Sequence, residues 1–238
     1  MISLSYDLHI HSCLSPCGDN DMLPSNIVGM AALKNLDVIA VTDHCSCRNC
    51  PAVAKLADAY GVTALFGMEL TSEEEVHILC LFDDLKAAME YGEYVRSQYL
   101  DIMNVPAIFG DQLIVDEDDN VIGTEDTLLI NATKIGFEYI YDKVEEYGGV
   151  MIPAHVEKKA NSLIANLGAV PEESKFRTFE MKHVGYRDEL CEKHPYFKDC
   201  LMISNSDAHY LEHINEPINF LEADEKSAKA VLKALKNL

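Results

Sequence analysis

Basic residues are scarce in this sequence. Lys and Arg total 19 against 40 acidic residues, which gives a formal net charge of −21. A field of that sign repels a phosphodiester backbone, so a long nucleic acid is an unfavourable substrate. Divalent metal ions bound at a site would cancel part of this charge locally. The composition therefore favours a small substrate.

Long apolar runs, a targeting segment and a linker are also missing. No stretch approaches the roughly 18 uninterrupted apolar residues of a membrane helix. The opening MISLSYDLHIHS has neither the basic nor the apolar region of a signal peptide. No internal repeat or Gly/Ser-rich boundary divides the chain. We therefore expect one domain over residues 1–238, cytoplasmic and without a membrane partner.

Short apolar runs alternate with helical patterns, which indicates βα units around a parallel sheet. We expect strands at 4–9, 38–42, 63–70, 76–81, 150–154, 178–181 and 202–204, and helices at 24–35, 52–60, 85–99, 137–147, 162–167 and 225–237. Residues 103–131 interrupt the rhythm, because QLIVDEDDNVIG is typical of two strands joined by a polar turn. We expect this segment to be an insertion, either a cap over the site or a hairpin on the outer wall.

Metal-ligand residue types follow the predicted strands. In DLHIHS, His9 and His11 are two residues apart on a strand, so both point to one face and can grip one ion. Similar residues follow other apolar runs: Asp43 and His44, Glu69, His155, and Asp207 with His209, while His77 begins the run after Glu69. Because the carboxyl ends of parallel barrel strands share one mouth, we expect these side chains to converge there.

These motifs resemble those of the PHP (polymerase and histidinol phosphatase) family. DLHIHS is similar to the family's first motif, TDH to its second, GMEL with VHIL to its third and SDAH to its last, in the same order. The resemblance implies a distorted (β/α)7 TIM-like barrel with two or three Zn, Mn or Fe ions at its C-terminal mouth.

The resemblance also implies how the ligands are shared. One ion would be held by His9, His11, Glu69 and Asp207, and Glu69 would bridge to a second ion completed by His77 and His155. His44 and His209 would hold a third ion with a carboxylate from the loop after the first motif. Counting back from Pro24 selects Asp19 for that position, with Asp21 as the alternative.

The expected reaction is hydrolysis of a phosphate ester. Cations neutralise the phosphoryl oxygens, and a water that bridges two ions becomes available as hydroxide near neutral pH. Asp207, Glu69 and His209 are the expected catalytic residues, and Asp43 would orient an imidazole. Arg48 and Lys158, which follow proposed ligands closely, are the preferred phosphate-binding residues. Glu180 could contact the substrate or be an internal carboxylate paired with a base.

Five cysteines lie near the same expected mouth, namely Cys13, Cys17, Cys45, Cys47 and Cys50. A thiolate metal site is one reading, but the spacing matches no common signature well, and we expect reduced thiols packed in loops.

The favoured function is a phosphomonoesterase acting on a small metabolite or nucleotide. The alternatives are an exonuclease or nucleoside 3′,5′-bisphosphate phosphatase, a histidinol phosphatase, and a metal-binding barrel without activity. Release of mononucleotides from an oligonucleotide would favour the nuclease. An inert metal-loaded protein would favour the last reading.

Overall fold

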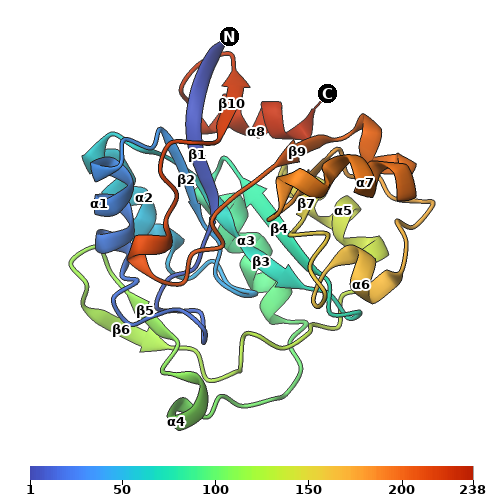
Figure 1. Cartoon of the computed structure of the whole chain (residues 1–238). Helices are drawn as coiled ribbons and strands as arrows, with labels where there is room; N and C mark the ends of the chain where they lie inside the picture. Colours follow the sequence, from blue (N-terminus) through green and yellow to red (C-terminus); the bar gives the residue numbers. More distant parts are fainter. Residues whose placement is uncertain (238) are drawn as a thin grey trace.

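A curled, six-stranded sheet forms the centre of the fold (Figure 1). The description rests on a computed structural model of the chain and covers residues 1–237. The strands of this sheet lie in the order β10-β1-β2-β3-β4-β7. Their bounds are β1 Ile2–Ile10, β2 Val38–Val41, β3 Thr63–Thr71, β4 His77–Phe82, β7 Val150–Pro153 and β10 Phe220–Ala223. A parallel pair, β8 (Thr178–Glu180) and β9 (Leu201–Ile203), follows β7 in space.

Helices cover the outer side of the sheet (Figure 1). Their bounds are α1 Pro24–Leu33, α2 Cys50–Tyr60, α3 Leu85–Arg96, α5 Phe137–Glu146, α6 Leu163–Leu167, α7 Arg187–Lys193 and α8 Ala228–Lys236, with short 3₁₀ turns η1 Val184–Tyr186, η2 Pro195–Asp199 and η3 Leu211–His213. Strands β2 and β7 are buried on both faces, as expected for strands with helices outside and side chains inside a barrel. The predicted α/β architecture is therefore confirmed.

Strand β4 departs from the predicted parallel arrangement. It pairs antiparallel with both β3 and β7, whereas β1, β2 and β3 are mutually parallel. The turn between Thr71 and His77 is too short for a crossover, so the chain folds straight back as a hairpin. As a result His77, at the start of β4, lies opposite Thr71 and reaches the edge where the neighbouring strands end. The expectation of seven regular βα units is not confirmed.

Strand β10 was not predicted from the sequence. It pairs antiparallel with the beginning of β1, and only alternate residues of it, Leu221 and Ala223, are buried. This pairing places the start of β1 beside β10, which packs against α8 at the same end of the molecule (Figure 1). No helix within residues 1–237 has the length and apolar character needed to traverse a bilayer.

The segment 103–131 forms a small unit beside the mouth of the sheet. It contains the predicted strand pair, β5 (Leu113–Val115) and β6 (Val121–Thr124), and a short helix α4 (Pro106–Phe109). Leu113 N donates to Cys13 O, and Ser25 and Lys55 bind acidic residues of the β5–β6 turn. The segment is therefore attached to the loop after β1 and to the outer helices, at the end of the molecule that carries the candidate site (Figure 1).

Candidate metal centre

Glu69, near the end of β3, lies at the centre of a group of histidines. Its carboxylate is almost fully buried, with a side-chain exposure of 1%. Its oxygens lie 2.9 Å from His77 Nδ1, 3.1 Å from His155 Nε2, 3.2 Å from His44 Nδ1, 3.3 Å from His9 Nε2 and 3.4 Å from His11 Nε2. Burial alone would raise the pKa of Glu69, but His77, His9 and His155 hold it well below its ordinary value. One carboxylate thus joins five histidine side chains from four other segments of the chain.

Asp207 adds a second carboxylate on the other side of His9 and His11. Its Oδ1 lies 3.4 Å from the Nε2 atoms of both rings. His209 lies next to it, with the Nδ1 atom 2.8 Å from the Asp207 carbonyl oxygen. Burial lowers the pKa of His209 to about 4, so its imidazole is neutral at pH 7 and can act as a ligand. The structure therefore brings Asp207 and His209 to the same cluster as Glu69.

Glu180 orients His9 from behind. Both Glu180 oxygens lie 3.1 Å from His9 Nδ1, and one of them also accepts from the His155 backbone N–H at 2.9 Å. Asn205 donates to the other oxygen at 2.8 Å. Burial alone would raise the pKa of Glu180, but His9 holds it below its ordinary value. Glu180 is therefore an internal carboxylate that fixes His9 with Nε2 facing the cluster.

Asp43 orients His11 through a serine. Ser15 Oγ donates its proton to Asp43 Oδ1 at 2.7 Å, and this serine oxygen also lies 3.0 Å from His11 Nδ1. Since the hydroxyl proton is used by Asp43, the serine oxygen accepts from His11 Nδ1–H, which leaves Nε2 free. Asp43 also accepts from the backbone N–H and the hydroxyl of Ser12. Asp43 thus acts on the cluster indirectly.

The loop after β1 places a cysteine where a carboxylate was expected. Cys17 Sγ lies 3.1 Å from His209 Nε2. The carboxylate of Asp19 instead accepts from the Asp21 backbone N–H at 2.9 Å, and Asp21 itself is exposed. Counting back from Pro24 assumed that the loop keeps the family's conformation, but here the extra residues bring Cys17 next to His209, and Asp19 Oδ1 caps a turn within the loop. Within residues 1–237, neither carboxylate joins a group of potential ligands.

Three groups of side chains could each hold an ion. Their ligand atoms lie within 4.8 Å of one another, and the groups are His9, His11 and Glu69; His44, Glu69 and His77; and His11, Cys17, His44 and His209. Ligands of one ion, about 2.0–2.3 Å from it, are separated by roughly 3–3.6 Å, which matches the distances around Glu69. The residues therefore fit divalent ions.

Orphaned nitrogen atoms support the same conclusion. His77 Nε2 and His155 Nδ1 are buried and have no hydrogen-bond partner among the described residues. His44 Nδ1 is also buried without one, although it lies 3.2 Å from Glu69. A buried imidazole nitrogen without a partner is costly unless an ion or water satisfies it.

Two of these side chains sit on unusual backbone. His155 has φ +32° and Asp207 has φ +53°, in or near the left-handed region that residues with a Cβ rarely adopt. Such a conformation costs on the order of 1–3 kcal/mol and persists where surrounding contacts impose it. Here the Glu180 contact to His155 N holds the first of them in place.

Of the two predicted phosphate-binding residues, only Lys158 reaches the cluster. Its Nζ lies 2.6 Å from Asp207 Oδ2, and its side chain is 35% exposed. Arg48 instead lies 3.1 Å from Glu125 Oε2 in the 103–131 segment. The sequence could not indicate that pair, whose members are 77 residues apart.

A small cavity of about 240 Å³ opens above the cluster. It is lined by Cys17, His44, Glu69, His77, Ile130, His155, Lys158, Ala160, Asn161, Asp207 and His209. Ile130 is the contribution of the 103–131 segment.

Of the five cysteines expected near the mouth, only Cys17 lines this cavity. Cys45, Cys47 and Cys50 are buried in the hydrophobic core, and Cys13 is buried in the loop after β1.

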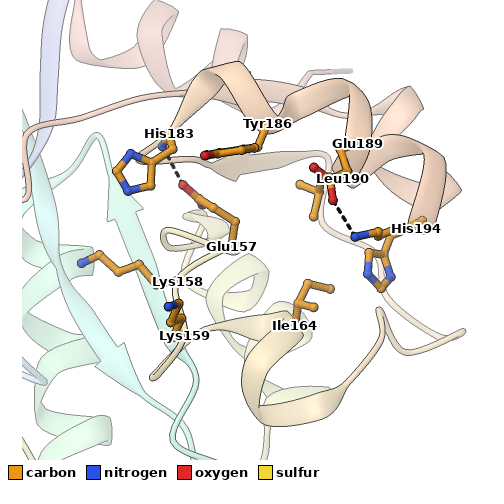
Figure 2. Close-up of a pocket in the computed structure, with 10 residues that line it drawn as sticks. Glu157, Lys158, Lys159, Ile164, His183, Tyr186, Glu189, Leu190 and His194 are labelled. Atoms are coloured by element: carbon orange, nitrogen blue, oxygen red, sulfur yellow. Dashed lines mark hydrogen bonds and ion pairs between the residues drawn. The ribbon is translucent and has the colours of Figure 1, made fainter.

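A larger cavity of about 690 Å³ adjoins it and shares Lys158 (Figure 2). Its wall is formed by the loop after β7, α6, η1 and α7, and it includes Glu157, Lys159, His183, Tyr186, Glu189, Lys193 and His194. Lys158 lies at one side of this cavity and His194 at the other (Figure 2). Three lysines and two glutamates line this cavity, so it lacks the acidic excess of a chain with a net charge of −21; Lys158 is paired with Asp207, and Lys193 with Glu189.

Comparison with known proteins gives a consistent result. A family model described as the PHP domain matches residues 7–237. An uncharacterised protein of Methanocaldococcus jannaschii is 33% identical over 99 residues, which cover 38% of this chain and 58% of that relative. The match thus spans less than two thirds of the curated relative's length.

Solved structures share the fold at low sequence identity. A lesion-specific endonuclease from Pyrococcus furiosus superposes with a TM-score of 0.67 and 19% identity, over all of this chain and 56% of that one. An endonuclease Q bound to a 27-mer duplex with an abasic lesion gives a TM-score of 0.63 at 19% identity, over all of this chain and 57% of that one. A protein of Bifidobacterium adolescentis assigned as a metal-dependent phosphoesterase gives 0.63 at 18% identity, over 95% of both chains.

Proposed function

The chain belongs to the PHP domain family, and from that membership and the geometry of its site we propose that it is a metal-dependent phosphoesterase. The observation that carries the proposal is the convergence of five histidines on the buried carboxylate of Glu69. We further propose that Asp207 and His209 complete the centre. When bound, divalent ions neutralise phosphoryl oxygens and make water a better nucleophile.

Buried carboxylates hold the imidazole rings of two proposed ligands in a fixed orientation. Glu180 holds His9, and Asp43 holds His11 through Ser15, so both rings present Nε2 to the centre. Lys158 is placed to bind a phosphoryl oxygen as a point charge, since its ammonium group already contacts a carboxylate at the cavity. Asp207, between Lys158 and the histidines, is positioned to orient a water or accept its proton.

We propose that the substrate is a small phosphorylated metabolite or nucleotide. The 240 Å³ cavity at the metal cluster suits a phosphoryl group, and the adjoining cavity of 690 Å³, which is lined by three lysines, has room for the rest of a nucleotide-sized molecule. Tyr186 and His183 contribute aromatic side chains to its wall. The net charge of −21 disfavours a long nucleic acid, although a fold relative binds duplex DNA.

The test is phosphate release by chelator-treated protein reloaded with Zn, Mn or Fe. The panel contains nucleotides, nucleoside 3′,5′-bisphosphates, sugar phosphates, histidinol phosphate and a short oligonucleotide. We expect metal-dependent release from a small phosphomonoester. Mononucleotides from the oligonucleotide alone would establish the nuclease instead, and no release by metal-loaded protein would defeat the proposal.

Replacing residues 103–131 with a Gly/Ser linker tests whether this segment is a cap. If it is, the relative rates on the substrates of the panel should change, and an unaltered ranking would contradict the cap.

Lys158→Met should raise KM for the phosphomonoester by about 10- to 100-fold, because a charge-assisted contact worth about 1.5–3 kcal/mol is lost. Arg48→Met is the comparison, since Arg48 binds Glu125 away from the cluster. It should leave KM unchanged and lower the free energy of unfolding, because Glu125 is buried. Steady-state kinetics and thermal unfolding of both variants check this, and an equal KM for Lys158→Met and the wild type would contradict the role of Lys158.

A further inference from the structure

The loop after β1 has a shape that directs Cys17 toward the histidines. Ser15 N donates to Ser12 O and Gly18 N donates to Ser15 O, which forms two successive turns. A Cβ at Gly18 would lie 2.3 Å from Ser12 O, so only glycine permits this close approach. The backbone N–H of Asp19 then donates to the His209 carbonyl oxygen at 3.0 Å. The loop is thereby fastened to the loop that carries His209.

The sulfur atom meets a ring whose tautomer is fixed. The Nδ1 atom of His209 lies 2.8 Å from the Asp207 carbonyl oxygen, which can only accept a hydrogen bond, so Nδ1 carries the proton. His209 Nε2 is therefore unprotonated and has a free lone pair, and this atom lies 3.1 Å from Cys17 Sγ. His44 lies in the same group, with all ligand atoms within 4.8 Å.

His11 is shared between two of the candidate groups, but it has only one free nitrogen. Its Nδ1 is occupied by Ser15, so Nε2 can bind one ion. If it serves the ion of His9 and Glu69, the remaining group is Cys17, His44 and His209. Three protein ligands with one open position are typical of catalytic rather than structural zinc.

We propose that Cys17, in place of a carboxylate, is the anionic ligand of a zinc-selective third position that it forms with His44 and His209. Of the two carboxylates of the loop, Asp19 accepts a hydrogen bond from Asp21 N and Asp21 is exposed, and within residues 1–237 neither belongs to a group of potential ligands. A thiolate is a soft ligand that favours Zn²⁺ over Mn²⁺, whereas a carboxylate suits Mn²⁺. This inference rests on the proposed function, because it concerns one ion of the same centre.

Cobalt substitution tests it without relying on activity. Chelator-treated protein loaded with Co²⁺ should show a sulfur-to-cobalt charge-transfer band in the near ultraviolet. In Cys17→Ser the band should disappear, one ion fewer should be bound per chain, and zinc affinity at this position should fall at least about 100-fold. Cys17→Asp should restore the ion count without the band, and should shift competition at this position from Zn²⁺ toward Mn²⁺.

Cys13→Ser is the matched control, because Cys13 lies in the same loop but its Sγ faces Leu113 O at 3.8 Å. Its spectrum should equal that of the wild type. A band that persists in Cys17→Ser would overturn the assignment, and so would full metal loading of the wild type without a band. Failure of the wild type to bind any ion would overturn the proposed function as well, so the two failures are distinguishable.

Discussion

Glu69→Gln should lower kcat/KM by at least about 10³-fold, the largest catalytic effect we expect from a single substitution. The carboxylate touches five histidines, so the loss of its charge affects every candidate ion except one held by Cys17, His44 and His209. His44→Ala should cost less, about 10- to 100-fold, because Glu69 keeps its other histidine contacts. Kinetics and metal analysis of both variants measure the difference.

Glu73→Gln is the control for this comparison. Glu73 is exposed on the turn between β3 and β4, close to Glu69 in sequence but outside the cluster. It should retain wild-type activity and metal content. Equal losses in Glu69→Gln and His44→Ala, with the metal content of both unchanged, would contradict a bridging role for Glu69.

Gly67→Ala should destabilise the fold strongly, lowering the free energy of unfolding by about 2–4 kcal/mol. Gly67 lies in β3 opposite Leu81, and an added Cβ would lie 2.0 Å from Cys80 O and 3.1 Å from Leu81 Cα. Both contacts are backbone, so β3 and β4 would have to separate. Since Glu69 follows two residues later and His77 begins β4, metal affinity should fall together with stability.

Gly29→Ala provides the opposite case. Gly29 lies inside α1, and nothing is within 4 Å of the position its Cβ would take. Alanine there should stabilise the protein by about 0.5–1 kcal/mol, because glycine is a poor helix former. Denaturant unfolding of both variants tests the pair. If Gly67→Ala unfolded like the wild type, the close β3–β4 contact would be wrong.

The sequence predicted elements better than their directions. Apolar runs located β1, β2, β3 and β7 to within two residues at each end, because helices and side chains bury both faces of these strands. The direction of β4 was missed, since an apolar run reads the same in either direction and only the short turn before His77 reverses the chain. β10 was missed because only Leu221 and Ala223 of its four residues are buried.

The site shows the same limit. Positions at a strand end or just past it, such as His9, Glu69 and His155, can be placed by sequence reasoning because the sheet fixes where they point. The ligand from the long loop after β1 cannot, since the course of this loop depends on hydrogen bonds such as Asp19 N to His209 O. The sequence did hold one indication that Cys17 could reach the cluster. Gly18 follows it, and a glycine there lets the loop fold back on Ser12.

The centre also depends on contacts between distant parts of the chain. Leu8 N donates to the side chain of Asn205, 197 residues away, and Ser206 N donates to Asp7. Closing so long a loop is slow, and its entropic cost must be met before the contact can stabilise the fold. Glu69 and His77 meet early across one hairpin, whereas Asp207 joins them only when β1 meets the loop after β9. We therefore expect a chain that has not closed to offer a partial ligand set and to release bound ions to a chelator first.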